Sequence, residues 1–276
     1  MADSRIRLKN PWIAGLLAFL VPGLGHVYQG RLFKALIYFV CISGMFLTGA
    51  RMADWHAIQA PPFQYRMKGR NLLMLKFAAQ VGMGLPALGA MVQTRRYLSA
   101  ENRPVKAIES SFSAPFEGRF TPFGPGARAP QRVTGTVTFV PQATRTGPII
   151  GGRFEGVGED GQTIQLTLEE AHLAQRIDSS RLRQVASKVN AEGGGAAGDL
   201  QGGIPRPLGD WLGVPLNDNE QRALEGRLGK WHELAMVLTW IAGLLNVLAI
   251  WDALEGPAYG YSDAESEKFA AVPVGR

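Results

Sequence analysis

The feature that most constrains this chain is an apolar run near the N-terminus that is broken and then resumed. Residues Pro11–Val27 carry no charged side chain, and Pro22-Gly23-Leu24-Gly25 interrupts them. A second apolar run, Leu32–Ala50, has its one charge, Lys34, near the edge. A helix needs about 18 to 20 apolar residues to cross the ~30 Å hydrocarbon core of a bilayer. The second run meets this length and the first falls just short, so together they predict a membrane hairpin with a glycine-rich break.

Two further stretches are apolar along their length. Leu72–Val92 has 21 residues with Lys76 near one end, and Leu234–Trp251 has 18 residues and is flanked by tryptophans, which favour membrane interfaces. The segment 97–230 is instead rich in glycine, proline and charge. We therefore expect a mostly α membrane protein of the cell membrane, with three to four hydrophobic helices and a small α+β soluble insert.

The first apolar run leaves the topology open. A cleaved signal peptide is disfavoured because no small-residue cleavage site follows it. If the run crosses the membrane and the N-terminus is inside, eight Lys and Arg residues near the segment ends lie on the inner side and nine on the outer side. This near-equal count sets no orientation. If the run is re-entrant, twelve of these basic residues lie on the inner side and five on the outer side. This count favours a cytoplasmic 97–230 region and an outward C-terminal tail.

Two sequence motifs carry a family resemblance. The first runs from Asn10-Pro11 through Pro22, Gly23, Gly25, Tyr28 and Gly30 and resembles the small two-transmembrane-helix domain found widely in bacteria. The second, Ile241–Ala253 followed by Glu255-Gly256-Pro257-Ala258, resembles an uncharacterised bacterial multi-pass membrane family. The resemblance implies a hairpin, a third helix, a variable insert and a last helix in a bacterial inner membrane. It implies no activity, cofactor or catalytic residue.

The glycines of the first motif have two interpretations. Small residues allow helices to pack closely where lipid gives no hydrophobic drive between them, so the motif shapes a tight hairpin. Alternatively, it presents His26 and Tyr28 to a membrane-embedded partner.

Polar residues inside the apolar segments are the other candidates for function. Lys76 and Gln80 lie four residues apart on one helix face, Asn246 lies near the middle of the last helix, and Asp252 lies at its end. An ion pathway usually contains several buried carboxylates, and none lies inside these segments. We therefore interpret these four residues as polar contacts between helices.

The soluble insert shows mixed patterns. Val133–Val140 alternates as a strand does, and Ile149–Val157 and Gln162–Leu168 flank an Asp-Gly turn, which predicts a β-hairpin. Thr167 and Glu170 have the spacing of a capping box, so a helical stretch is expected from Leu168 to Val189. Either it is continuous, or Asp178-Ser179-Ser180 interrupts it and caps a second helix. The division is a basic tail 1–10, hairpin 11–50, loop 51–70, third helix 71–93, Pro-rich linker 94–130, α+β region 131–190, flexible linker 191–230, last helix 231–253 and tail 254–276.

No catalytic signature is present in the sequence. The triple glycine 193–195 lacks the Lys and Ser/Thr of a phosphate loop, the four histidines have no zinc-ligand spacing, and Cys41 is the only cysteine. The net charge of +6 is explained by basic residues flanking the membrane segments, without a nucleic-acid partner. We expect no enzyme and no cofactor or metal. The expected role is a membrane scaffold or accessory subunit that binds a protein or envelope partner, or a second copy, through the insert; the alternative is a small transport or channel component with a polar intramembrane path.

Overall fold

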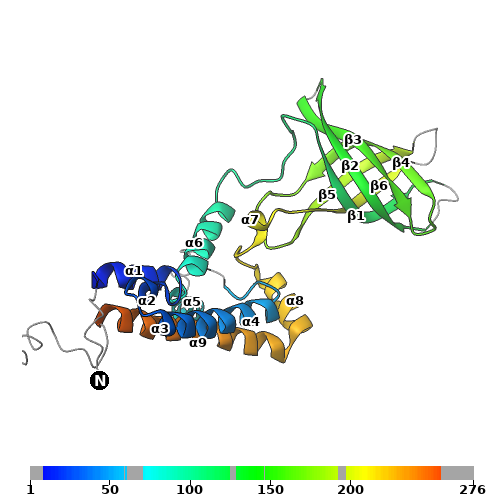
Figure 1. The fold of residues 1–276 in the computed structure, drawn as a ribbon. Helices are drawn as coiled ribbons and strands as arrows, with labels where there is room; N and C mark the ends of the chain where they lie inside the picture. Colours follow the sequence, from blue (N-terminus) through cyan, green and yellow to red (C-terminus); the bar gives the residue numbers. More distant parts are fainter. Residues whose placement is uncertain are drawn as a thin grey trace, which may run out of the picture. The chain divides into compact units, whose positions relative to one another are not determined.

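The computed structural model describes residues 9–58, 60, 71–124, 129–145, 147–191 and 197–255. Most of the basic tail, most of the 51–70 loop, the triple glycine and the C-terminal tail beyond residue 255 lie outside the described residues. The chain forms two compact units (Figure 1), a helical unit of residues 1–94 and 215–276 and a barrel unit of residues 95–214.

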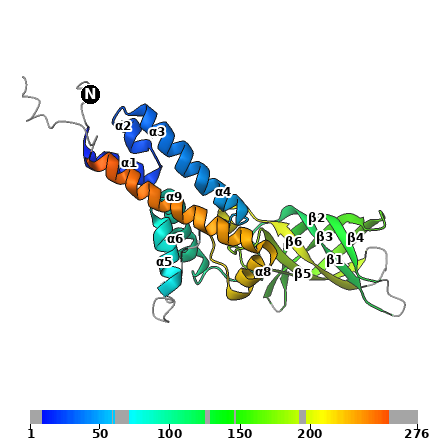
Figure 2. The same ribbon diagram turned by 90° about the horizontal axis from the view of Figure 1, so that it is seen from below.

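The helical unit is built around its last helix, α9 (Lys230–Glu255). Figure 2 shows α9 running between the N-terminal helices and α5, and it packs against α1, α4 and α5. Among the residues that the structure describes, two stretches are long and apolar enough to cross a membrane, the 26-residue α9 and the 21-residue Leu32–Met52. The other helices in the described ranges are α1 (Pro11–Leu20), α2 (Leu24–Tyr28), α3 (Leu32–Tyr38), the π-helical η1 (Phe39–Ser43), α4 (Gly44–Met52), α5 (Asn71–Val81), α6 (Leu85–Tyr97), α7 (Leu208–Trp211) and α8 (Asp218–Leu228).

Proline and glycine set the ends of the short helices. The side chain of Asn10 accepts a hydrogen bond from the backbone N–H of Trp12 at the start of α1, and α1 ends after ten residues, just before Pro22. At a rise of about 1.5 Å per residue, α1 is about 15 Å long, half the thickness of a bilayer core. The expected third helix is likewise divided into α5 and α6, and Gly84 lies between them with a φ of 63°.

Small residues line the buried face of α9. Ala235, Ala242, Gly243, Ala249 and Ala253 are buried at helical spacing. A Cβ atom on Gly243 would overlap the carbonyl oxygen of Ala79, and one on Gly82 would overlap that of Gly243. Helix backbones can approach this closely only where side chains are absent, so glycine is required at the α5–α9 contact.

The second unit is a closed antiparallel barrel in which each strand pairs with the next and β6 closes onto β1. Closure leaves no unpaired strand edge. The strands are β1 (Phe112–Pro122), β2 (Gln131–Thr144), β3 (Gly147–Gly158), β4 (Thr163–Leu173), β5 (Leu182–Ala191) and β6 (Gly198–Pro205).

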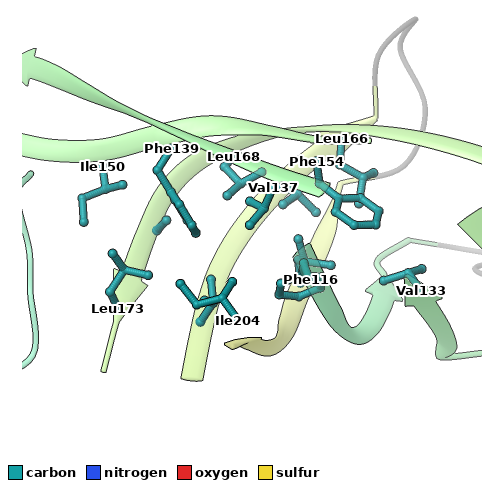
Figure 3. Close-up of a cluster of buried hydrophobic side chains, with 14 of the residues drawn as sticks. Phe116, Val133, Val137, Phe139, Ile150, Phe154, Leu166, Leu168, Leu173 and Ile204 are labelled. Atoms are coloured by element: carbon teal, nitrogen blue, oxygen red, sulfur yellow. The ribbon is translucent and has the colours of Figure 1, made fainter. Parts of the chain in front are cut away.

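Apolar side chains fill the interior of the barrel, as the close-up in Figure 3 shows. Phe116, Phe139 and Phe154 are buried there with less than 2% of their surface exposed. The inward-facing Gly118 and Gly202 leave room for the ring of Phe116, whose tip a Cβ at either position would overlap. The barrel is therefore a packed core and not a ligand-holding cup.

The structure corrects the predicted fold class. The expectation of a mostly α membrane protein with three to four hydrophobic helices and a small α+β insert is wrong, because the insert is a six-stranded barrel and two helices have spanning length among the described residues. The hairpin around the Asp-Gly turn is confirmed as β3 and β4, and the strand at 133–140 is confirmed within β2.

Other expectations for the insert are also wrong. The helix expected from Leu168 to Val189 is absent, because these residues form much of β4 and β5. The segment expected as a Pro-rich linker, 94–130, contains β1, and the segment expected as a flexible linker, 191–230, contains β6, α7 and α8. Cross-strand pairing over long sequence separations overrides the local helical pattern here.

Candidate functional site

The most concentrated polar contact in the helical unit surrounds Asp252, near the end of α9. Its carboxylate accepts hydrogen bonds from His26 Nε2 at 2.8 Å and from Lys34 Nζ at 3.1 Å. Tyr38 Oη and Arg31 Nη2 each donate to it at 3.3 Å. We call these five residues the Asp252 cluster. It joins the end of α9 to the N-terminal hairpin more than 210 residues away in the chain.

The glycine motif is what brings the hairpin residues to Asp252. Gly23 has a φ of 82°, in the left-handed region that glycine adopts readily, and it turns the chain between α1 and α2. Gly25 lies so close to α1 that a Cβ would overlap the carbonyl oxygen of Ala14. The turn therefore places His26 on the inner face of α2, where it is fully buried.

A second layer of contacts holds the same junction. The side-chain amide of Gln29 donates to the carbonyl oxygen of Ala253 at 2.7 Å, and Arg31 Nη1 donates to that of Asp252 at 3.3 Å. The orphan carbonyls at the end of α9 are thereby capped by side chains of the hairpin. Arg31 is 6% exposed, whereas Lys34 is 45% exposed, so Arg31 forms the better-shielded ion pair.

The cluster lacks the parts of a catalytic site. A His–Asp pair acts as a base only when a nucleophile lies within reach, and no Ser or Cys hydroxyl or thiol is among the five side chains. In the described residues, His26 Nδ1 is buried without a hydrogen-bond partner. The described part of the chain also contains no group of three metal-ligating side chains. The geometry therefore fits a structural cluster of ion pairs and hydrogen bonds that joins the helices.

The two amides predicted as intramembrane contacts donate mostly to backbone carbonyl oxygens. Asn246 Nδ2 donates to the carbonyl oxygens of Ala18 at 3.1 Å and Gly82 at 2.6 Å, near the ends of α1 and α5. Gln80 Nε2 donates to Ala57 O and to Thr239 Oγ1, both at 2.8 Å. These bonds tie three segments to α9 without leaving the amide N–H groups exposed along a channel.

The remaining predicted residues lie apart from one another. Lys76 sits with Nζ 6.0 Å from the ring centre of Trp240, separate from Asn246 and Asp252. Tyr28 packs beside α1 with Lys9 Nζ 5.0 Å from its ring centre, and Gly30 adopts a φ of 80°. Pro22 and the motif glycines act by shaping the hairpin.

Sequence reasoning missed the cations of the Asp252 cluster. One of its two interpretations of the glycine motif presented His26 to a partner, yet this ring is buried against Asp252. It noted Lys34 as a charge near the edge of an apolar run and gave Arg31 no contact. A carboxylate at the end of an apolar helix needs a compensating cation, and this requirement was the available signal.

The barrel unit also contains a cluster of arginines, most of which lie outside its strands. Asp210 accepts from Arg96 at 3.1 Å and from Arg176 at 2.9 Å. Arg206, whose side chain is 1% exposed, donates to the carbonyl oxygens of Ser180 and Gln175. Burial lowers the pKa of Arg183 below its usual value, and the neighbouring Arg206 and Arg176 lower this pKa further. These contacts join α6, α7 and the segment between β4 and β5.

The comparisons with known proteins bear on the family alone. The model of a family of unknown function, DUF6677, matches residues 13–265 and so covers both units. The chain belongs to the DUF6677 family. No curated protein and no solved structure matches it. The predicted relation to an uncharacterised family is thereby confirmed, and DUF6677 membership brings no assigned activity, ligand or catalytic residue to the Asp252 cluster.

Proposed function

We propose that this DUF6677 member is a multi-pass membrane scaffold or accessory subunit of the bacterial inner membrane, which binds a protein or envelope partner through its barrel unit. The packed interior of the closed barrel carries the proposal. Because side chains fill that interior, a partner has to be recognised on the outer face. The Asp252 cluster then stabilises the packing of the helices that hold the protein in the membrane.

The surface of the helical unit supports a lipid environment. Large apolar side chains point outward, with Trp12 at 78%, Phe33 at 77% and Leu248 at 65% exposure, whereas alanine and glycine fill the interior. Soluble proteins rarely expose so much contiguous apolar surface. Helices that pack in lipid show this distribution, because small residues let the backbones approach each other.

Ion pairs at both ends support an antiparallel pair of spanning helices. Lys34 meets Asp252 at one end of the pair, and Arg227 meets Asp54 at 2.7 Å near the other end. In this arrangement α1 and α2 enter from the first side and turn back at Pro22. Helices α5 and α6 enter from the second side and turn back near Gly84. Apart from α5 and α6, residues 53–229 then lie on one side of the membrane, with both termini on the other.

The positive-inside rule orients this arrangement. Within about 20 residues of the two spanning helices, seven Lys and Arg lie on the side of residues 53–229 and three on the side of the termini. The barrel is therefore cytoplasmic in the proposal, as in the re-entrant interpretation of the sequence. The N-terminus changes side, because α5 and α6 are two short helices and not one span.

Cysteine accessibility tests the anchor. In a Cys41→Ser background, single cysteines replace Glu159 in the β3–β4 turn or Ser4 near the N-terminus of the full chain. A membrane-impermeant maleimide applied to intact cells should label the Ser4 position and leave the Glu159 position unlabelled until the cells are opened. Labelling of the Glu159 position in intact cells would contradict a cytoplasmic barrel.

Site-specific photo-crosslinking tests the scaffold role. A photoreactive amino acid at Thr136, on the outer face of the barrel, should give a discrete crosslinked partner in native membranes. The matched control places it at Leu47, an exposed apolar position of α4, which should crosslink mainly to lipid. If a protein partner is crosslinked from Leu47 and none from Thr136, the partner binds the helices, and binding through the barrel is refuted.

A further inference from the structure

The outer face of the barrel carries an open depression that is lined by several hydrogen-bond donors. It has a volume of about 620 Å³ and lies across β1, β2, β5 and β6. Ligand sites in proteins commonly have volumes of about 300–1,000 Å³, so the depression is large enough for a small molecule. Its polar side chains are Glu117, Arg119, Arg132, Thr134, Gln184 and Gln201.

Two of these side chains are arginines held directly opposite each other. Arg119 on β1 and Arg132 on β2 are cross-strand partners, and Gln201 on β6 faces Arg119 from the other side. Both arginines are exposed. Like charges directly opposite in a sheet repel, so this register costs stability unless an anion lies between them.

Neither guanidinium has a counter-ion within the described part of the chain. No described residue forms an ion pair or a hydrogen bond with Arg119 or Arg132, and the same holds for the side chains of Thr134, Gln184 and Gln201. Elsewhere on the barrel an outward arginine is paired, since Arg153 Nη1 donates to Glu155 Oε1 at 3.3 Å. The one carboxylate lining the depression, Glu117, leaves an excess of one positive charge.

The donor geometry indicates what this surface binds. An arginine fork matches two oxygens of a carboxylate or phosphate, so a single carboxylate is used up by one fork, whereas a phosphate group has oxygens for two. The residues lining the depression include no aromatic side chain on which a base could stack. We propose that the depression at Arg119 and Arg132 is a binding site for a phosphate-bearing ligand without a nucleobase, such as a polyphosphate or a phospholipid headgroup.

This inference goes beyond the scaffold role and does not depend on it. Tripolyphosphate is titrated into the full chain in neutral detergent micelles and followed by isothermal titration calorimetry. We expect saturable binding that weakens about tenfold or more in Arg119→Gln and in Arg132→Gln, since a hydrogen bond to a charged group contributes strongly to affinity. Arg153→Gln, which removes an outward arginine away from the depression, should leave binding unchanged.

A conservative variant separates loss of the site from loss of folding. Arg132→Lys keeps the charge but removes the fork, and we expect affinity between that of the wild type and that of Arg132→Gln. Far-UV circular dichroism of each variant checks that the barrel is intact. Short-chain phosphatidic acid is titrated in parallel. Tighter binding than that of tripolyphosphate, with the same arginine dependence, identifies a lipid headgroup as the source, and the reverse order identifies a soluble compound.

Three results would overturn the proposal. They are no saturable binding of either phosphate compound, equal weakening in Arg153→Gln, and stronger binding of citrate than of both phosphate compounds. None of these outcomes bears on the partner detected from Thr136, so failure of the phosphate site and failure of the scaffold role are distinguishable.

Discussion

Removal of the Asp252 carboxylate should loosen the helical unit more than any other single change at the end of α9. Asp252→Ala leaves His26, Arg31, Lys34 and Tyr38 without their shared acceptor. Breaking a buried ion pair by removing one partner costs about 3–5 kcal/mol. The carboxylate is 21% exposed and Lys34 is 45% exposed, and solvent screening lowers the expected loss to about 2–3 kcal/mol.

Graded variants separate the contributions to this loss. Asp252→Asn keeps one acceptor oxygen but loses the charge, so we expect a loss of about 1–2 kcal/mol. Arg31→Ala should cost about 2 kcal/mol because Arg31 is the better-shielded cation of the cluster and also donates to the Asp252 carbonyl oxygen, whereas Lys34→Ala should cost less than about 1 kcal/mol, as exposed pairs do. The matched control is Glu255→Ala, an exposed carboxylate three residues further along the chain.

The assay is unfolding of the full chain in mixed micelles with increasing sodium dodecyl sulfate, followed at 222 nm. Helices dominate this signal, so it reports on the helical unit more than on the barrel. If Asp252→Ala and Glu255→Ala differ by less than about 0.5 kcal/mol, the cluster contributes nothing beyond a surface charge. The interpretation that the glycine motif positions the hairpin residues to stabilise the end of α9 would then be refuted.

Three further predictions concern packing. Gly25→Ala should destabilise the helical unit by about 2 kcal/mol or more, as substitutions that over-pack a site do. The control Gly44→Ala, with nothing within 4 Å of a new Cβ, should be neutral or stabilising by up to about 1 kcal/mol. The same detergent titration measures both variants. Asn246→Leu should cost about 2–3 kcal/mol by leaving buried carbonyl oxygens of α1 and α5 without a donor, and proteolysis near these helix ends should accelerate. Phe154→Ala should lower barrel stability by about 3–5 kcal/mol, visible as a shift of the thermal transition at 215 nm, while a shift confined to 222 nm would contradict the division into two units.

Several parts of the fold were predictable because their signals are local. The Asp-Gly turn between β3 and β4 fixes a hairpin within about 20 residues, and the alternation in β2 identifies one face of a strand. Apolar length likewise indicates α9 and the Leu32–Met52 helix. In each case neighbouring residues determine the outcome, so no distant partner has to be known.

The errors arose where distant pairing decides. Leu168, Leu173 and Val185 also fit a helical period, but their backbones pair with β3, β5 and β6. The inward glycines of β1 and β6 look like linker residues until the Phe116 ring is seen to occupy the space they leave. Closure of β6 onto β1 joins residues about 80 positions apart, and no local pattern encodes it.

The sequence by itself determined that this chain has apolar helices of spanning length and a hairpin broken at Pro22-Gly23. These properties follow from hydrophobicity and from the backbone freedom of glycine, which are fixed residue by residue. Only the tertiary structure decided that Asp252 meets the basic residues of the hairpin, that Asn246 joins α1 and α5, and that Arg119 faces Arg132 across two strands. Each of these is a contact between residues that only the folded backbone brings together.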